Sequence, residues 1–167
     1  MVVLDIKDFG RIKLELYPDE APQTVANFEK LVDSGFYNGL TFHRIISGFM
    51  IQGGDPTGTG MGSADSNIIG EFSANGVKNN VRHKRGTISM ARSRDYNSAS
   101  SQFFICHADC GFLDGQYAAF GKVLEGMETA EEIVKTPRDS SDKPLEPQVM
   151  ESVRVDTFGQ VYPFEQI

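Results

Sequence analysis

The chain lacks tryptophan altogether and has only two cysteines and three histidines among its 167 residues. Two cysteines cannot supply the disulfide framework of a small secreted domain. Cys106 and Cys110 lie four positions apart, a spacing that fits a metal site or a local disulfide. We favour a simpler interpretation, in which Cys106 is a buried strand thiol and Cys110 a loop thiol in a reducing compartment.

Basic residues and long apolar runs are also scarce. The 16 Lys and Arg are outnumbered by 23 Asp and Glu, which gives a net charge of -7. Such a chain repels phosphate backbones, so we exclude nucleic acid as a partner. No stretch approaches the ~18 apolar residues that a membrane helix needs, and residues 1–7 do not form a secretory signal. We therefore expect a cytoplasmic protein that does not contact membranes and, because no heptad pattern is present, a monomer.

The rest of the composition is that of a folded protein, with 40% hydrophobic and 23% charged residues. Apolar stripes at helical spacing predict two helices, one over Pro22–Asp33 and a second marked by Met127, Ala130, Ile133 and Val134. The remaining chain alternates short strands with long loops, including residues 63–85, which are mostly polar and predicted to be a surface excursion. Because helices do not alternate regularly with strands, we exclude a doubly wound parallel sheet and expect an antiparallel barrel or sandwich with helical caps.

One stretch, FHRIISGFMIQGGD, sets a cation and an amide among large apolar side chains and ends at paired glycines. Strand alternation places Phe42, Arg44 and Ile46 on one face. After a break in the strand, Met50 and Gln52 again share a face. An arginine beside this methionine and glutamine would line a shallow apolar groove. The alternative is a strand whose arginine simply extends into solvent.

Two later segments bear on the same groove. In the strand SQFFIC, alternation places Gln102 and Phe104 on one face and Phe103 and Ile105 on the other. The glycine-rich residues 56–63 follow a strand, but their glycine spacing does not complete a phosphate-binding loop. We expect them to form a flexible rim of the groove.

The sequence offers no evident nucleophile or general base. No Gly-x-Ser-x-Gly elbow occurs, and the histidines and cysteines show none of the paired spacings typical of zinc. A hydrolase that uses Ser or Cys is therefore a weak alternative, and we expect neither metal nor cofactor. One reaction that needs no bond to be made or broken is rotation about a prolyl peptide bond, whose barrier of about 18–20 kcal/mol comes from amide resonance.

Four blocks of the sequence, read together, resemble the cyclophilins: FHRII-x-GFMIQGGD, SQFFI, LDG and FGKV. The match follows the family's order from about Val2 to Asp156 and looks most like the small cytoplasmic bacterial type B peptidyl-prolyl isomerase. It implies a mainly β fold, a closed eight-stranded antiparallel barrel capped by two α-helices, in residues 1–158, with a tail of uncertain order in residues 159–167. It also implies cis-trans isomerisation of X-Pro bonds in proline-containing peptides and unfolded proteins, which assists protein folding without a cofactor.

The resemblance assigns site residues position by position. Arg44 matches the catalytic arginine, which assists loss of conjugation at the prolyl nitrogen, and Gln52 matches the glutamine that orients it and helps hold the substrate. The walls of the proline pocket are matched by Phe49, Met50, Phe104 and Leu113. The stretch that receives the N-terminal side of the peptide is matched by Ala91, Arg92 and Gln102. A proline-peptide binding module or folding helper with little turnover is the alternative function.

Three positions depart from the pattern of many family members. Phe112 stands where eukaryotic members often carry Trp, Tyr117 where they carry His, and Arg92 where an Asn is frequent. We keep Phe112 and Tyr117 as substrate-binding candidates. Because phenylalanine cannot donate the indole N–H hydrogen bond, we predict weak binding of cyclosporin with peptide turnover retained.

Overall fold

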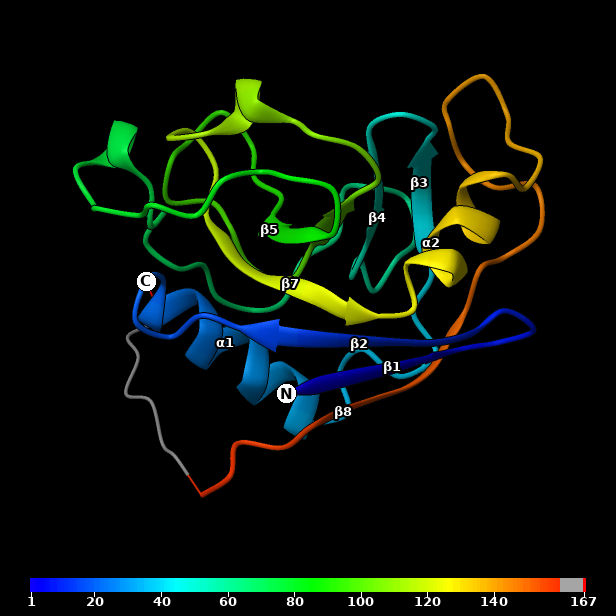
Figure 1. Ribbon diagram of the computed structural model, residues 1–167, viewed down its shortest axis with the longest axis horizontal. Helices are drawn as coiled ribbons and strands as arrows, with labels where there is room; N and C mark the ends of the chain where they lie inside the picture. The colour runs from blue at the N-terminus through cyan, green and yellow to red at the C-terminus, as the bar shows by residue number, and fades with distance from the viewer. Residues whose placement is uncertain (160–166) are drawn as a thin grey trace.

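The computed structural model describes residues 1–159 and 167 (Figure 1). Its two α-helices are α1 (Pro22–Asp33) and α2 (Met127–Val134), and its two short 3-10 helices are η1 (Ser73–Asn75) and η2 (Gly111–Leu113). The strands are β1 (Val2–Ile6), β2 (Gly10–Leu16), β3 (Phe42–Ile46), β4 (Met50–Gly53), β5 (Thr87–Met90), β6 (Phe103–Cys106), β7 (Ala119–Glu125) and β8 (Met150–Val155). Both predicted helices are confirmed, and α1 has the bounds expected from the sequence.

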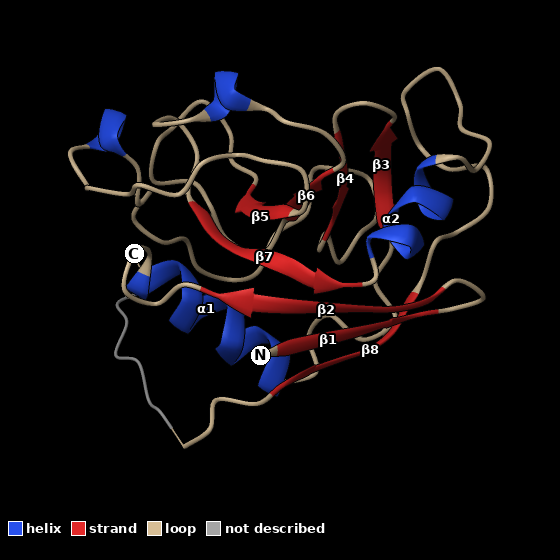
Figure 2. Ribbon diagram, in the orientation of Figure 1, coloured by secondary structure: helices blue, strands red, loops and turns tan. Residues whose placement is uncertain are grey.

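All eight strands form one strongly curled sheet in the order β3-β4-β6-β5-β7-β2-β1-β8 (Figure 2). Every neighbouring pair is antiparallel. The two ends of the sheet meet through a bridge between Thr41, just before β3, and Val149, just before β8. The predicted eight-stranded antiparallel barrel with two helices is confirmed, and its closure rests on this bridge and its flanking hydrogen bonds instead of a full strand ladder.

The concave side of the sheet holds the main hydrophobic core, which α1 covers at one end. Phe28 of α1 is fully buried and lies against the rings of Tyr37, Phe103 and Phe120 at centroid distances of 5.1, 5.5 and 5.2 Å. Aromatic packing of this kind adds to the free energy of burial. The hydroxyl of Tyr37 donates to the carbonyl of Ser101 at 2.8 Å, so its polar end is also satisfied.

The middle of residues 63–85 is not the surface excursion predicted from its polarity. Ile68 and Phe72 are buried in the main core, and the carboxylate of Glu71 is buried at the start of α1. That carboxylate accepts the backbone N–H groups of Gln23 and Thr24 at 3.0 and 2.8 Å, together with the Thr24 hydroxyl at 2.7 Å. The prediction failed here because a glutamate that caps a distant helix cannot be distinguished, from the sequence alone, from a glutamate exposed to solvent.

Strand β3 contains a bulge that corrects the predicted faces. Phe42 pairs with Gly53 and Arg44 pairs with Gln52, so His43 is an extra residue in the ladder. A bulge shifts the side-chain alternation by one position. Phe42 consequently points into the core and is fully buried, whereas Arg44 lies exposed on the convex face. The expectation that these two residues share a face is wrong, and Arg44 instead shares a face with its partner Gln52.

Candidate active site

Arg44 begins a row of polar side chains across the convex face of the sheet. Its Nη1 donates to Gln52 Oε1 at 3.3 Å, and Gln52 Nε2 donates to Gln102 Oε1 at 2.9 Å. The Nε2 of Gln102 in turn donates to the carbonyls of Gly60 and Gly62 at 3.0 and 2.8 Å. The row fixes both glutamine amides and points the Arg44 guanidinium over the groove.

A small hollow of about 150 Å³ lies beside this row. A cavity of about that volume holds a benzene ring, so a five-membered pyrrolidine ring fits. The hollow brings together residues from β3, β4, β6, the chain after β5, and the segment around η2. Its lining consists of Arg44, Phe49, Met50, Gln52, Ala91, Arg92, Phe104, Leu113 and Tyr117.

The floor of the hollow is a second apolar cluster, separate from the main core. Met50, Phe104 and Leu113 are buried in it together with Cys106 and Cys110. Both thiols are free, and burial raises the pKa of each of them. The predicted positions of Cys106 in a strand and Cys110 in a loop agree with the structure, in which Cys110 Sγ donates to the Phe49 carbonyl at 3.6 Å.

His83 supports Phe104 from behind. Its ring is stacked on the Phe104 ring at a centroid distance of 6.1 Å, with Nδ1 2.9 Å from Asp114 Oδ1 and Nε2 2.9 Å from Ser89 Oγ. The order Ser, His, Asp is that of a nucleophilic triad. Ser89 is nevertheless 0% exposed, so its hydroxyl cannot reach a substrate. We therefore interpret the arrangement as a support for the pocket.

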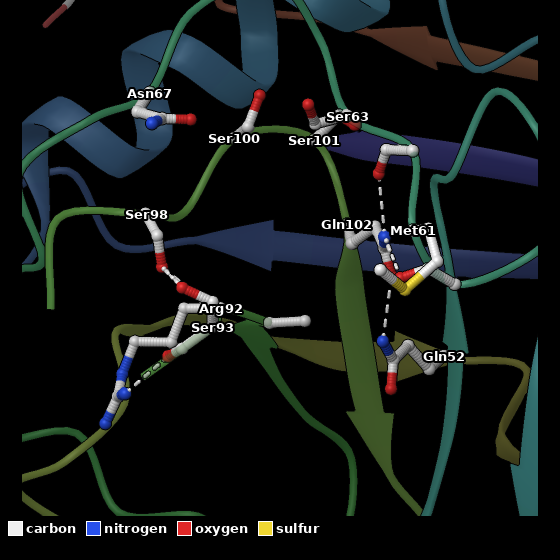
Figure 3. Close-up of a pocket in the computed structure, with 13 residues that line it drawn as sticks. Gln52, Met61, Ser63, Asn67, Arg92, Ser93, Ser98, Ser100, Ser101 and Gln102 are labelled. Carbon is white, nitrogen blue, oxygen red and sulfur yellow. Dashed lines mark hydrogen bonds between the residues drawn. The ribbon is translucent and has the colours of Figure 1, made fainter. Parts of the chain in front are cut away.

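A second, larger hollow of about 440 Å³ adjoins the first at Gln52, Ala91 and Arg92 (Figure 3). Gln102 lines this larger hollow, whose walls also carry hydroxyl and amide groups. Figure 3 shows the Arg92 side chain directed away from Gln52 and Gln102. Besides Gln52 and Gln102, the hydroxyl and amide residues of the lining are Ser63, Asn67, Ser93, Ser98, Ser100 and Ser101.

Asp55 orders the glycine-rich rim of these hollows. Its carboxylate accepts backbone N–H groups from residues 57, 59, 60 and 62 at 2.6–3.1 Å, as well as the Thr57 hydroxyl. Burial raises the pKa of this carboxyl, but the hydrogen bonds from Thr57, Gly62 and Gly60 outweigh burial and lower the pKa to about 2. The rim is thus held by an ionised carboxylate at neutral pH.

Comparison with protein-family models matches residues 1–155 to the family described as cyclophilin type peptidyl-prolyl cis-trans isomerase/CLD. The chain belongs to the cyclophilins. As a member of this family it is a peptidyl-prolyl cis-trans isomerase, as the sequence resemblance predicted. No helix among the described residues is both long and apolar enough to cross a membrane.

Curated relatives and solved structures agree with this placement. Peptidyl-prolyl cis-trans isomerase B of Bacillus subtilis is 47% identical over 125 residues, which cover 75% of this chain and 84% of that protein. Peptidyl-prolyl cis-trans isomerase-like 1 of Rhizopus delemar is 43% identical over 143 residues, 85% and 84% of the two chains. The crystal structure of a Cryptosporidium parvum cyclophilin in the presence of the dipeptide Ala-Pro superposes with a TM-score of 0.85 at 34% identity, covering 93% of this chain and 98% of that one.

The geometry of this cyclophilin gathers most of the site residues expected from the sequence. Nine of them line the small hollow, and Gln102 lines the adjoining one. Phe112 does not line either: it is 69% exposed, with its ring 5.6 Å from that of Phe49. Tyr117 does line the small hollow, where its ring packs edge-on against Phe104 at 6.1 Å.

The Arg92 guanidinium is fixed in this cyclophilin by contacts with neighbouring aromatic rings and with a backbone carbonyl. Its guanidinium lies 4.4 Å from the centre of the Tyr117 ring and 4.9 Å from that of Tyr96. Nε and Nη2 both donate to the carbonyl of Gln116, at 3.1 and 2.7 Å. The side chain therefore braces the wall that Tyr117 forms.

The supporting residues of the site were missed in the sequence. His83 lies in a basic run, Asp114 in a turn and Asp55 beside paired glycines, and no spacing relates the three. His83 and Asp114 are 31 residues apart, and only the fold brings them into contact. Asp55 and Asp114 lie within the blocks that carry the resemblance, and this position could have pointed to them, whereas His83 lies outside every block.

Proposed function

We propose that this cyclophilin binds the proline ring of a substrate in the hollow of about 150 Å³ and uses Arg44 to speed rotation of the preceding peptide bond. One observation carries the proposal. The Arg44 guanidinium stands at the edge of the hollow with a neutral amide, Gln52, as its side-chain partner. No carboxylate pairs with it in the described part of the chain, so its charge and most of its N–H groups are free to act on a substrate.

The chemistry follows from amide resonance. Rotation removes the double-bond character of the C–N bond and leaves a lone pair on the prolyl nitrogen. A guanidinium N–H directed at that nitrogen binds the twisted amide better than the planar one, which is the condition for lowering the barrier. Lowering the barrier by about 5.5 kcal/mol accelerates rotation roughly ten-thousandfold. Gln52 holds the Arg44 guanidinium and the bound peptide in the correct position relative to each other.

We infer that the substrates are proline-containing segments of flexible or unfolded proteins, whose folding the enzyme assists. The Ala-Pro dipeptide named with the Cryptosporidium parvum structure supports a proline ligand for this chain as well. Residues before the proline would lie along Ala91, Arg92 and Gln102. Since the small hollow accepts only one ring and the larger one is lined by small polar groups, we expect broad selection of the flanking residues. We further propose a monomer in the cytoplasm, where its two free thiols stay reduced.

A proline-peptide binding module with little turnover is the alternative. Pure binding needs the apolar hollow but does not need a cation at its edge. The hydrolase alternative is weaker, because the one Ser-His-Asp chain in the described residues has its serine buried. Activity that survives serine-blocking and thiol-blocking reagents would remove it.

The decisive experiment replaces Arg44 and measures catalysis and binding separately. We expect Arg44→Ala to lower kcat/KM on an Ala-Ala-Pro-Phe peptide by about 100- to 1000-fold, the typical effect of losing one donor to a developing lone pair or charge. Arg44→Lys keeps the charge but loses the planar fork and should recover only part of the rate. Arg11→Ala, in a surface ion pair with Asp5, is the control and should leave the rate unchanged. An Arg44→Ala protein that keeps full turnover would overturn the proposal, and a wild-type protein that binds the peptide without turnover would favour the binding module.

A further inference from the structure

A third hollow, of about 530 Å³, opens on the Arg44 side of the proline pocket. It shares Arg44 and Gln52 with that pocket, whereas the hydroxyl-lined hollow of Figure 3 meets the same pocket at Gln52, Ala91 and Arg92. The small pocket is therefore bordered by one hollow at Arg44 and by another at Ala91 and Arg92, and the two larger hollows also meet each other at Gln52 and Gly60. The proposed catalytic function uses the first two hollows and leaves the third without a role.

The wall of the third hollow is a loop that docks on the free edge of β3. The backbone N–H of Ile45 donates to the carbonyl of Asp142 at 2.8 Å, and Arg138 Nη1 donates to the Ile45 carbonyl at 2.8 Å. The loop closes on itself, because Asp139 N–H donates to the Lys143 carbonyl at 2.8 Å and Lys143 N–H donates to Asp139 Oδ1 at 3.1 Å. Lys143 is thereby held on the same side of the sheet as Arg44.

The lining of this hollow is cationic in a protein of net charge -7. Arg44 and Lys143 both face it, and neither forms an ion pair within residues 1–159. Asp139 is the one acid in the lining, and its Oδ1 already accepts the backbone N–H groups of Ser141 and Lys143. Two cations without acidic partners, set against an acidic surface, mark a place where an anion is favoured.

His43 forms the base of the hollow and remains uncharged there. It is 6% exposed, and burial lowers its pKa from the ordinary value. Neither of its ring nitrogens has a hydrogen-bond partner among the described residues. The attraction for an anion at neutral pH therefore comes from Arg44 and Lys143.

We propose that the third hollow is a subsite for an acidic side chain, a carboxylate or a phosphate, in the residues that follow the substrate proline. The inference rests on the proposed function, which directs the residues before the proline toward Ala91 and Gln102 and so leaves the Arg44 side for those after it. Lys143 holds the anion as its ion-pair partner, and Arg44 adds attraction while keeping N–H groups free for the prolyl nitrogen. The enzyme thus prefers proline followed closely by an acidic residue.

The test compares terminally blocked peptides in which glutamate, phosphoserine or glutamine occupies the first, second or third position after proline, with turnover measured by NMR exchange spectroscopy. For at least one position we expect kcat/KM to be about three- to fivefold higher for glutamate than for glutamine, as for a partly exposed ion pair. The ratio should fall in 0.5 M salt, because salt screens the attraction. The same substitutions placed before the proline should give a ratio close to one.

Two variants assign the effect to Lys143. In Lys143→Gln the ratio of glutamate to glutamine turnover should fall to about one, and Lys143→Glu should favour lysine over glutamate at that position. Lys13→Gln removes an equal charge from β2, where Lys13 pairs with Glu125, and should keep the preference. A ratio of one at all three positions, or a preference that survives in Lys143→Gln, would overturn the subsite. If none of the peptides is isomerised, it is the proposed catalytic function that fails, so the two failures are distinguishable.

Discussion

The concave and convex faces of the sheet carry two apolar clusters, and alternate residues of the same strands supply both. On β6, Phe103 and Ile105 point into the main core, whereas Phe104 and Cys106 belong to the convex cluster. The concave cluster is closed by α1 and made almost wholly of carbon. The convex cluster is open to a groove and bordered by amides and a guanidinium. One face of this fold therefore stabilises the protein and the other forms the binding groove. Because side chains alternate along a strand, successive residues contribute to opposite faces.

Phe103→Ala tests the concave face and should have the largest effect on stability. Phe103 is 1% exposed and packs edge-on against Phe28 and Tyr37. Its removal leaves a closed cavity, so we expect a loss of about 3–5 kcal/mol in the free energy of unfolding. Urea denaturation monitored by circular dichroism gives this value. A loss below about 1 kcal/mol would contradict the assignment of Phe103 to a closed core.

Phe104→Ala, one residue further along, tests the convex face. Water can enter the enlarged pocket from the groove. The loss in the free energy of unfolding should therefore be close to the transfer free energy of the side chain alone, roughly 1.5–3 kcal/mol. Catalysis should fall far more than stability explains, because the proline ring loses one wall. The folded fraction of the variant, measured in the same buffer, corrects the rate for unfolding. Equal losses of stability in the Phe103 and Phe104 variants, with normal turnover in the latter, would break the distinction between the two faces.

The local alternation of side chains was predictable from the sequence, and so was the convex groove. Gln102 with Phe104, and Met50 with Gln52, follow from the two-residue repeat of a strand, and the confirmed α1 follows from its apolar stripe. The placement of Phe42 was not predictable in this way. A bulge at His43 depends on how β3 pairs with β4, and pairing is not encoded in the alternation of a single strand.

Contacts between distant segments were the other part that the sequence did not reveal. Glu71 caps α1 across 47 residues, and Lys143 reaches the Arg44 side of the groove because its loop docks on β3. Lys143 lies in a polar segment without periodicity, and Glu71 is a charged residue within the short apolar run of residues 68–72, so neither side chain by itself indicates a distant contact. Only the buried surroundings distinguish Glu71, and those exist only once the sheet has curled.

The pH dependence of stability tests the role of His83, which supports the convex cluster through Phe104. Burial lowers the pKa of His83, with Asp114 opposing the shift. The unfolded chain therefore takes up a proton near pH 6.5 that the folded protein resists, and stability should be constant above about pH 7.5 and fall as the pH drops through about 6.5. The pKa of His43 is also lowered by burial and adds to the same slope.

His83→Gln keeps hydrogen-bonding groups at this position but does not titrate. Its free energy of unfolding should depend less on pH between 5 and 7 than that of the wild type, whatever its value at pH 8. Thermal or urea unfolding at a series of pH values gives both slopes. Identical slopes in the two proteins would show that His83 is not the group through which acid weakens the convex face.

Phe112→Trp tests the outermost part of the convex face and should have the smallest effect. Phe112 packs against Phe49 but lies outside the lining of the proline pocket, so turnover of a short peptide should stay unchanged. The indole N–H adds one donor to a larger ligand that extends beyond the pocket. One hydrogen bond is worth about 0.5–1.5 kcal/mol, so the inhibition constant of cyclosporin should fall roughly three- to tenfold. A wild-type protein already inhibited at nanomolar cyclosporin would contradict the predicted weak binding. Slower peptide turnover in Phe112→Trp would place position 112 inside the proline pocket instead of at its outer edge.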